Sequence, residues 1–250
     1  MFSGFSQIVV NITFIVCIPL FTYSCIKIKM SMLKKDWWKY LSGVLLLYAI
    51  VVGFFVDIPD SMIHQTMRNL FYHVGMWFGM FSMLITGFIY SLRYLRKFKE
   101  AEDLVAVEAV NVGLMFGFLG IFTGMIWANF TWGSPWVKDP KLNGAAVGLF
   151  IYLAYMILRG SIDDVQKRAK VSAVYNIFAF FLWIVFVLIL PRISGESIHP
   201  GKDSPPVLPM HLEPSMRFVF YPAMIGWILL GFWIMNLRVR LRKVRLKLDS

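Results

Sequence analysis

The chain has 250 residues, of which 58% are hydrophobic and only 16% are charged, and its formal net charge is +11. This apolar content is too high for a soluble domain of this length, and it predicts an all-α fold, a polytopic membrane helix bundle. In such a protein a basic excess marks the loops on the inner side of the membrane, so it does not indicate a nucleic-acid partner.

Residues 1–31 have three interpretations. The stretch from Ile8 to Ile26 is apolar enough to form an extra N-terminal helix, and the lysines behind it would hold its end inside. A cleaved signal peptide is less favoured, because no basic residue precedes the apolar stretch and no A-x-A-like site follows it. In the third interpretation the natural start is Met32, whose sequence M-L-K-K-D-W-W-K-Y is typical of an inside-facing N-terminus.

Six further segments are long and apolar enough to cross a membrane, within a core domain at residues 32–237. They are expected at Tyr40 to Val56, Leu70 to Leu92, Val107 to Ala128, Gly144 to Leu158, Val171 to Leu190 and Phe218 to Leu237. Few ionisable side chains fall within them. Because ion-coupled transporters usually keep charged groups at mid-membrane depth, this argues against such a transporter.

The connections between these segments alternate in charge. Lysine and arginine cluster before the first segment, between the second and third, between the fourth and fifth, and after the sixth, where residues 238–250 form a basic tail. By the positive-inside rule these regions face the cytoplasm and the other connections face outward. We therefore expect a multi-pass membrane protein with a cytoplasmic C-terminus, whose outer loops lie in the periplasm if the cell has one.

The second outer connection is dense in aromatic and turn-forming residues. From Trp127 to Asn143 the chain reads W-A-N-F-T-W-G-S-P-W-V-K-D-P-K-L-N. Proline removes a backbone donor and clashes with the preceding helical turn, so we expect this segment at or outside the membrane surface rather than in a spanning helix. Its indole rings are either interfacial anchors or a flat platform for a planar ligand.

The histidines fall on the same outer side. His73 begins the second segment at its outer end, and His199 lies in the third outer loop. Two neutral imidazoles that converge from different parts of the chain suit bis-histidine ligation of a haem iron. His211 lies in the same loop and is the rival of His199, whereas His64 is interpreted as a solvated loop residue.

The surroundings of these histidines favour a porphyrin over a bare metal ion. The chain has no H-x-x-x-H or H-E-x-x-H motif of the kind that builds a compact metal site. Haem instead requires aromatic faces and cations for its two propionates. The outer side offers Trp127, Trp132 and Trp136 as faces, and Arg68, Lys141 and Arg217 as cations.

A family resemblance follows from the tryptophan segment. Trp132, Gly133, Trp136 and Asp139 form a W-G-x-x-W-x-x-D core between the third and fourth of six segments. This pattern resembles the tryptophan-rich signature of the haem-handling proteins of cytochrome c maturation, and among them the CcmC type. The likeness runs from about Lys34 onward in segment count, loop order and motif placement.

The resemblance implies roles for individual residues. His73, in an H-V element, and His199, in I-H-P-G, match the family's two axial haem ligands, and this match ranks His199 above His211. The W-G-x-x-W-x-x-D core, with Trp127, matches the haem platform and the docking site of a chaperone.

The chain also departs from the family's usual motif. Pro135 and Lys138 stand where tryptophans are common, and Lys141 and Asn143 replace an arginine and a threonine. The aromatic platform is therefore thinner, and the two lysines would meet propionates as point charges without the bidentate fork of arginine.

The resemblance further implies a non-enzymatic function. A protein of this type lies in the bacterial inner membrane, binds haem b as transient cargo at the periplasmic face and delivers it to a CcmE-like periplasmic haem chaperone. Its other implied partners are CcmA-like and CcmB-like ABC transporter subunits, a small CcmD-like membrane subunit and membrane lipid. Two alternatives remain open, a haem transporter or permease and a b-type electron-transfer subunit.

Overall fold

The computed structural model describes residues 36–58, 64–199 and 212–248. Every regular element in these ranges is a helix, and six helical segments are long and apolar enough to cross a membrane. They are Trp37–Phe55, Thr66–Lys97, Glu100–Trp132, Pro140–Gly160, Val165–Ile193 and Pro214–Leu248. The all-α membrane bundle with six core spans is thus confirmed, whereas the segment 1–31 lies outside the described residues.

The chain divides into a unit of residues 1–40 and a unit of residues 41–250. Of the first unit the structure describes residues 36–40, in which helix α2 (Trp37–Phe55) begins and Lys39 forms an ion pair with Asp36. Every other element described below belongs to the second unit.

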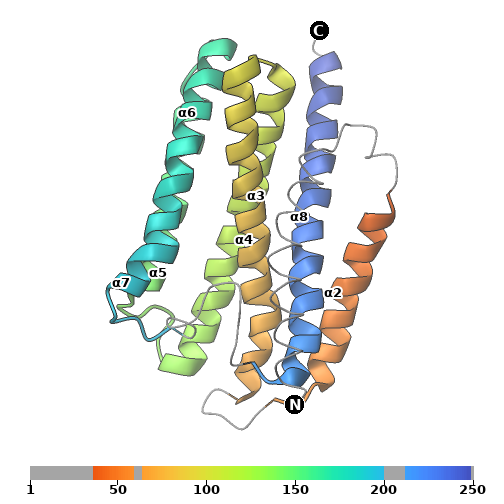
Figure 1. Ribbon diagram of the computed structural model, residues 1–250, viewed down its shortest axis with the longest axis vertical. Coiled ribbons are helices and arrows are strands. Elements are labelled where there is room, and N and C mark those ends of the chain that lie inside the picture. Colours follow the sequence, from red (N-terminus) through yellow and green to blue (C-terminus); the bar gives the residue numbers. More distant parts are fainter. Residues whose placement is uncertain (1–35, 59–63, 200–211, 249–250) are drawn as a thin grey trace, which may run out of the picture. The chain divides into compact units, whose positions relative to one another are not determined.

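Helices α3 (Leu70–Lys97) and α4 (Glu100–Trp132) form the centre of the second unit. Figure 1 shows them between α8 (Pro214–Leu248) on one side and α5 (Pro140–Gly160) with α6 (Val165–Ile184) on the other. A short 3-10 helix, η2 (His64–Asn69), leads into α3. From Leu41 onward α2 packs on α8, where the Ser42 hydroxyl donates to the Gly226 carbonyl at 3.0 Å.

Small residues let these helices approach closely. A methyl group added at Gly113 of α4 would lie 3.0 Å from the Leu84 side chain of α3, and one at Gly231 of α8 would lie 3.0 Å from Phe116. In lipid, where no hydrophobic effect drives helices together, such close packing is a main source of helix association. The core is correspondingly dense, and Met80 and Met83 are fully buried in it.

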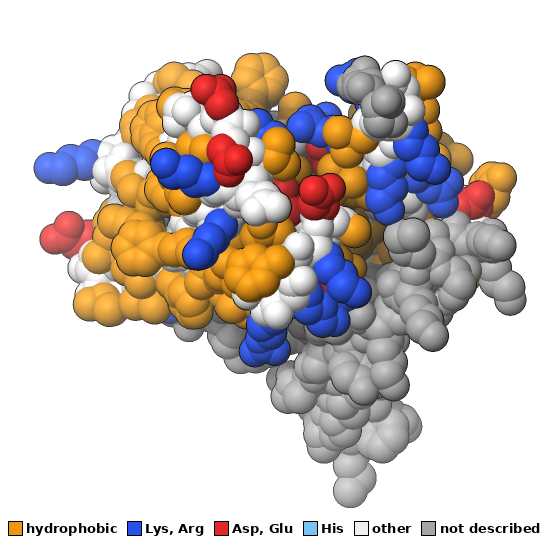
Figure 2. Space-filling model, turned by 90° about the horizontal axis from the view of Figure 1, so that it is seen from above, with side chains coloured by type: hydrophobic (Ala, Val, Ile, Leu, Met, Phe, Trp, Pro, Cys, Tyr) orange, Lys and Arg blue, Asp and Glu red, His pale blue; other side chains and the backbone are white. Residues whose placement is uncertain are grey.

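Ion pairs link α4 to three neighbouring helices near its first residues, at what we call the basic end of the bundle, where the α3–α4 connection, the α5–α6 connection and the C-terminus of α8 lie. The pairs are Glu102 with Arg93 (2.9 Å), Asp103 with Arg159 (2.5 Å) and Glu108 with Arg238 (2.6 Å). Acidic residues in the first helical turn also interact favourably with the helix dipole. Figure 2 looks onto this end and shows lysine and arginine side chains gathered there among apolar ones.

Helix α8 continues without a break to Leu248. The segment 238–250, expected as a basic tail, therefore forms the last turns of this helix as far as residue 248. It extends the helix beyond the 20 or so residues that a membrane requires.

The α-helical geometry of the fifth span is interrupted near its C-terminal end. After α6, a π-helical turn η3 (Val185–Ile189) and a short helix α7 (Leu190–Ile193) complete it. Gly144 of α5 packs against the Phe186 carbonyl so closely that a side chain there would overlap the backbone. π-Helical turns are rare and frequently mark functional sites.

The expected extent of the tryptophan segment was wrong in part. Helix α4 runs on to Trp132, so Trp127–Trp132 is helical, and α5 begins at Pro140. Only residues 133–139 leave the helices. The physical reason is that no proline or glycine occurs between Trp127 and Trp132, and that Pro140 stands at the first position of its helix, where its missing N–H is not needed.

Candidate functional site

The α4–α5 connection is built by two helix-terminating residues. Gly133 caps α4 with a positive φ of 74°, and its N–H donates to the Asn129 carbonyl at 3.0 Å. A left-handed conformation of this kind favours glycine, which has no Cβ to clash. The turn that follows separates Trp132 at the end of α4 from Trp136, whose indole N–H donates to Asn143 Oδ1 at 3.2 Å. Asn143, one of the departures from the family motif, thus holds one of the motif's tryptophans.

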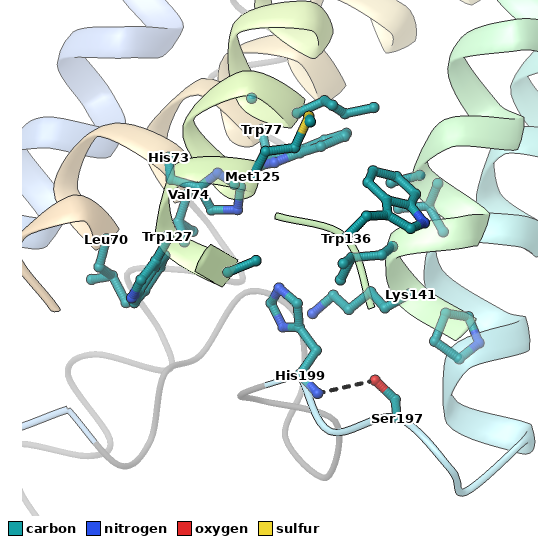
Figure 3. Close-up of a pocket in the computed structure, with 18 of the residues that line it drawn as sticks. Leu70, His73, Val74, Trp77, Met125, Trp127, Trp136, Lys141, Ser197 and His199 are labelled. Atoms are coloured by element: carbon teal, nitrogen blue, oxygen red, sulfur yellow. Dashed lines mark hydrogen bonds between the residues drawn. The ribbon is translucent and has the colours of Figure 1, made fainter. Parts of the chain in front are cut away.

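A cavity of about 350 Å³ lies beside this connection. Its walls come from α3, α4, the start of α5, the end of α6 with η3 and α7, and the segment that leads to His199. We call it the histidine cavity, because both His73 and His199 line it (Figure 3). The other predicted site residues that line it are Trp127, Trp132, Trp136 and Lys141.

His73 lies on α3 with only 7% of its surface exposed. Trp77 and Trp127 meet its ring edge-on, with centroid separations of 6.3 Å and 5.8 Å. Its Nδ1 lies 3.1 Å from the Thr123 hydroxyl oxygen of α4. Trp127 is held in turn by a 3.2 Å hydrogen bond from its indole N–H to Thr66. The imidazole is therefore fixed on several sides and borders the cavity.

The ring of His73 rests against a glycine of α4. A methyl group added at Gly124 would lie 2.7 Å from His73 Cε1, closer than such carbon atoms approach in proteins. If the cavity binds haem, as the resemblance implies, we expect Gly124→Ala to displace the imidazole and to reduce the haem that co-purifies with the protein about tenfold, because the ring is already confined by its neighbours. Haem per protein in the detergent-purified variant measures this.

The matched control for that substitution is Gly43→Ala, since a methyl group added at Gly43 meets no atom within 4 Å. This control is expected to keep its haem. If Gly124→Ala retained as much haem as Gly43→Ala, the position of the His73 ring would not matter for binding.

Asp139 organises the start of α5. It is fully buried, and its Oδ1 accepts hydrogen bonds from the N–H groups of Lys141 (2.8 Å) and Leu142 (3.2 Å). These donors belong to the first helical turn, where they have no partner within the helix. Asp139 is thus the N-cap of α5, a position that aspartate favours strongly.

The second oxygen of Asp139 holds the segment that carries His199. Asp139 Oδ2 accepts hydrogen bonds from the Ser197 hydroxyl (2.9 Å) and the Ile198 N–H (2.8 Å). The His199 N–H donates to the same Ser197 hydroxyl at 3.3 Å (Figure 3). The His199 ring then meets Trp132 with a centroid separation of 6.3 Å. One carboxylate therefore joins the tryptophan connection to the second histidine.

The charge state of Asp139 follows from these contacts. Burial raises its pKa, but the hydrogen bonds from Ser197, Lys141, Ile198 and Leu142 outweigh this effect and lower the pKa below its usual value of 3.8. The side chain is an anion at neutral pH. The sequence predicts Asp139 as part of a haem platform; in the structure its two oxygens bond to the protein itself.

The three cations predicted as propionate contacts lie in different places. Lys141 lines the histidine cavity, and Figure 3 shows its side chain extending toward His199. The guanidinium of Arg68 instead donates to the Gly53 carbonyl, and that of Arg217 to the Leu212 carbonyl at 2.6 Å. Among the described residues, Lys141 is the one of the three that lines this cavity.

Trp77 and Arg192 are two of the cavity residues that were not among the site residues predicted from sequence. Trp77 lies one helical turn after His73 on the same face of α3, and the spacing H-x-x-x-W was the available signal. Arg192 of α7 also lines the cavity, and its guanidinium donates to the Leu188 carbonyl. A single arginine at the end of a span has no distinguishing pattern, so only the structure brings it to the site.

The remaining histidines keep their earlier interpretations as predictions. His64 begins η2, and the surroundings of its side chain are not described. His211, the rival of His199, lies outside the described residues.

Fold and site together define a polytopic helical membrane protein with a cavity lined by histidine and tryptophan at one end of the bundle. The model of the CcmC family, heme exporter protein C, matches residues 21–248. The chain belongs to this family, which confirms the resemblance seen in its motifs.

Curated relatives agree with this assignment. The heme exporter protein C of Haemophilus influenzae is 25% identical over 219 residues, which cover 82% of this chain and 83% of the relative. That of Escherichia coli K12 is 25% identical over 218 residues, covering 84% and 81%. A cytochrome c biogenesis protein CcsA of Pelargonium hortorum is 30% identical over 124 residues, covering 49% of this chain and 38% of the relative.

Proposed function

We propose that this protein binds haem b as transient cargo in the histidine cavity and delivers it to a periplasmic haem chaperone during cytochrome c maturation. The relatives support a role in haem handling for cytochrome c maturation, because their names refer to heme export and to cytochrome c biogenesis. Binding and release require no bond of the cargo to be broken, so the proposal is a carrier and not an enzyme.

The observation that carries the proposal is the shared cavity of His73 and His199. One imidazole comes from α3 and the other from the segment after α7, and both line the same space between indole rings. Two imidazoles are a common axial pair for haem iron. Within the described residues no group of three or more His, Cys, Asp or Glu side chains could hold a bare metal ion. The donor set therefore suits a porphyrin, which brings its own four nitrogen ligands.

The charges in the cavity suit the propionates of haem. Lys141 and Arg192 both line it, and the nearby carboxylate of Asp139 has each oxygen occupied by two hydrogen bonds. We propose that these two cations meet the propionates, the arginine as a planar donor and the lysine as a point charge. The apolar remainder of the wall would contact the porphyrin ring.

We further propose that the cavity faces the periplasm and that the basic end faces the cytoplasm, in a bacterial inner membrane. The positive-inside rule supports this orientation, because lysine and arginine side chains gather at the basic end (Figure 2). An outward cavity would let a CcmE-like chaperone reach the haem from the periplasm. CcmA-like, CcmB-like and CcmD-like subunits are the further proposed partners.

The test is haem transfer between purified proteins. We expect the detergent-purified protein to show a haem absorption spectrum, and the Soret band to move to the soluble domain of a CcmE-like chaperone when the two are mixed and separated. A protein purified from haem-replete cells without any haem would contradict the proposal. Haem that is reduced by a quinol and is never transferred would support an electron-transfer subunit instead, and uptake of haem into proteoliposomes would support a transporter.

A further inference from the structure

The hydroxyl group of Thr123 lies between His73 and the backbone of α4. Its oxygen is 2.9 Å from the Leu119 carbonyl, 3.1 Å from the Gly120 carbonyl and 3.1 Å from His73 Nδ1. A hydroxyl has one hydrogen to donate and two lone pairs with which to accept. Because both carbonyls can only accept, the hydrogen of Thr123 points to the backbone, and its oxygen is left to accept from the imidazole.

This arrangement determines where the proton of neutral His73 is located. If Thr123 accepts from Nδ1, then Nδ1 carries the hydrogen and Nε2 carries the lone pair. An imidazole can bind a metal only through a nitrogen that has a lone pair. The hydrogen bond to Thr123 therefore favours the tautomer in which Nε2 is the metal-binding atom, and the neighbouring Gly120 carbonyl also interacts with the imidazole.

Thr123 is also tied to α3 through its backbone. Asn69, one helical turn before His73, donates from its side-chain amide to the Thr123 carbonyl at 3.0 Å. Asn69, the last residue of η2, and His73 of α3 thus contact Thr123 at two points, which holds its hydroxyl beside the imidazole. Gly124, the next residue, leaves the room in which the ring lies.

We propose that Thr123 is a positioning residue for haem binding, which holds His73 in the Nδ1–H tautomer and in the orientation that presents Nε2 to the iron. This inference rests on the proposed function, in which His73 is an axial ligand. Outer-shell partners of metal-bound histidines act in this way, and their loss typically lowers metal affinity about 10- to 100-fold. A hydrogen bond accepted from Nδ1–H also makes the imidazole a stronger donor, which stabilises ferric over ferrous haem.

The proposal is tested with Thr123→Val and Thr123→Ser. Valine has nearly the shape of threonine but no hydroxyl, whereas serine keeps the hydroxyl. In the haem-free protein, ¹⁵N NMR of labelled histidine is expected to show the Nδ1–H tautomer of His73 for the wild type and for Thr123→Ser, and a mixture of tautomers for Thr123→Val. In the haem-loaded protein, Thr123→Val is expected to release haem to a competing apo-globin at least tenfold faster and to have a higher reduction potential.

Thr86→Val is the matched control. Thr86 lies on α3, is buried, and donates to the Ser82 carbonyl at 2.7 Å, but it does not line the histidine cavity. It should change neither the His73 tautomer nor the reduction potential. Wild-type tautomer and wild-type haem release in Thr123→Val would overturn the proposal.

Failure of the proposed function is seen separately. It would appear as a wild-type protein without haem, or as haem release that does not depend on His73. The tautomer measurement uses the haem-free protein and is read independently of that outcome.

Discussion

Replacing both His73 and His199 by glycine is expected to leave the purified protein without detectable haem. The two imidazoles line the same cavity from separate elements, and in the proposed function they are the axial ligands of the iron. Loss of an outer-shell partner of a metal ligand costs about 10- to 100-fold in affinity, so loss of both ligands should cost more than this. Absorption spectra and haem-to-protein ratios after purification measure the effect.

Rescue with imidazole separates ligation from a general loss of structure. A His→Gly substitution leaves space at the cavity wall, and free imidazole can enter it and replace the missing ligand. We expect millimolar imidazole to restore a bis-imidazole spectrum in each single variant. His211→Ala, as the control for the rival histidine, is expected to keep its haem; loss of haem in this variant, but not in His199→Gly, would move the second ligand to His211.

Replacing Asp139 by alanine is expected to cause the second large effect. Four hydrogen bonds end on this buried carboxylate, two from the first turn of α5 and two from the segment that carries His199. Loss of an N-cap costs about 1 kcal/mol, and each buried hydrogen bond to a charged group contributes about 1.5–3 kcal/mol. We therefore expect a clear decrease in the melting temperature in detergent, together with loss of haem, because His199 is no longer held beside Trp132.

A comparison with another N-cap shows which part of this effect is specific. Asp164 caps α6 by accepting from the Lys167 N–H at 2.6 Å, and it is exposed. Asp164→Ala should lower stability by about 1 kcal/mol or less and leave haem binding intact. Equal effects of the two substitutions on haem would show that Asp139 does not position the second histidine.

The lowered pKa of Asp139 also predicts a pH dependence. Because its pKa in the folded protein lies below the usual value of 3.8, the contribution of Asp139 to stability is present at neutral pH and is lost as the pH falls through that lowered value. Asp139→Asn has no group to protonate there. Its stability should therefore lack the part of the acid transition that belongs to Asp139.

Much of the fold could be predicted because hydropathy acts locally. The six spans follow from apolar runs of sufficient length, and their order follows from the chain itself. Errors arose at the ends of the spans, where apolar and polar residues mix. Trp127–Trp132 was assigned to the outer connection because of the prolines behind it, yet those prolines act only on their own turns.

The candidate site was predictable in its members more than in their roles. His73, His199, Trp127, Trp132, Trp136 and Lys141 were all predicted, and the structure brings all of them to one cavity. The role of Asp139 could not be predicted, because its partners Ser197 and Ile198 lie in a distant part of the sequence. Arg192 was not predicted as a site residue, because nothing beside it in the chain marks it and only the fold brings it to the cavity.

The sequence by itself therefore determined that this is a six-span helical membrane protein of the CcmC family with a tryptophan-rich connection, because hydropathy and motifs are properties of neighbouring residues. Only the tertiary structure decided how the connection is used. Hydrogen bonds from Ser197 and Ile198 to Asp139, and the hydrogen bond between His73 and Thr123, join segments that only the packing of the helices brings together. Such contacts depend on helix rotation and on close approach at glycine, which no local pattern specifies.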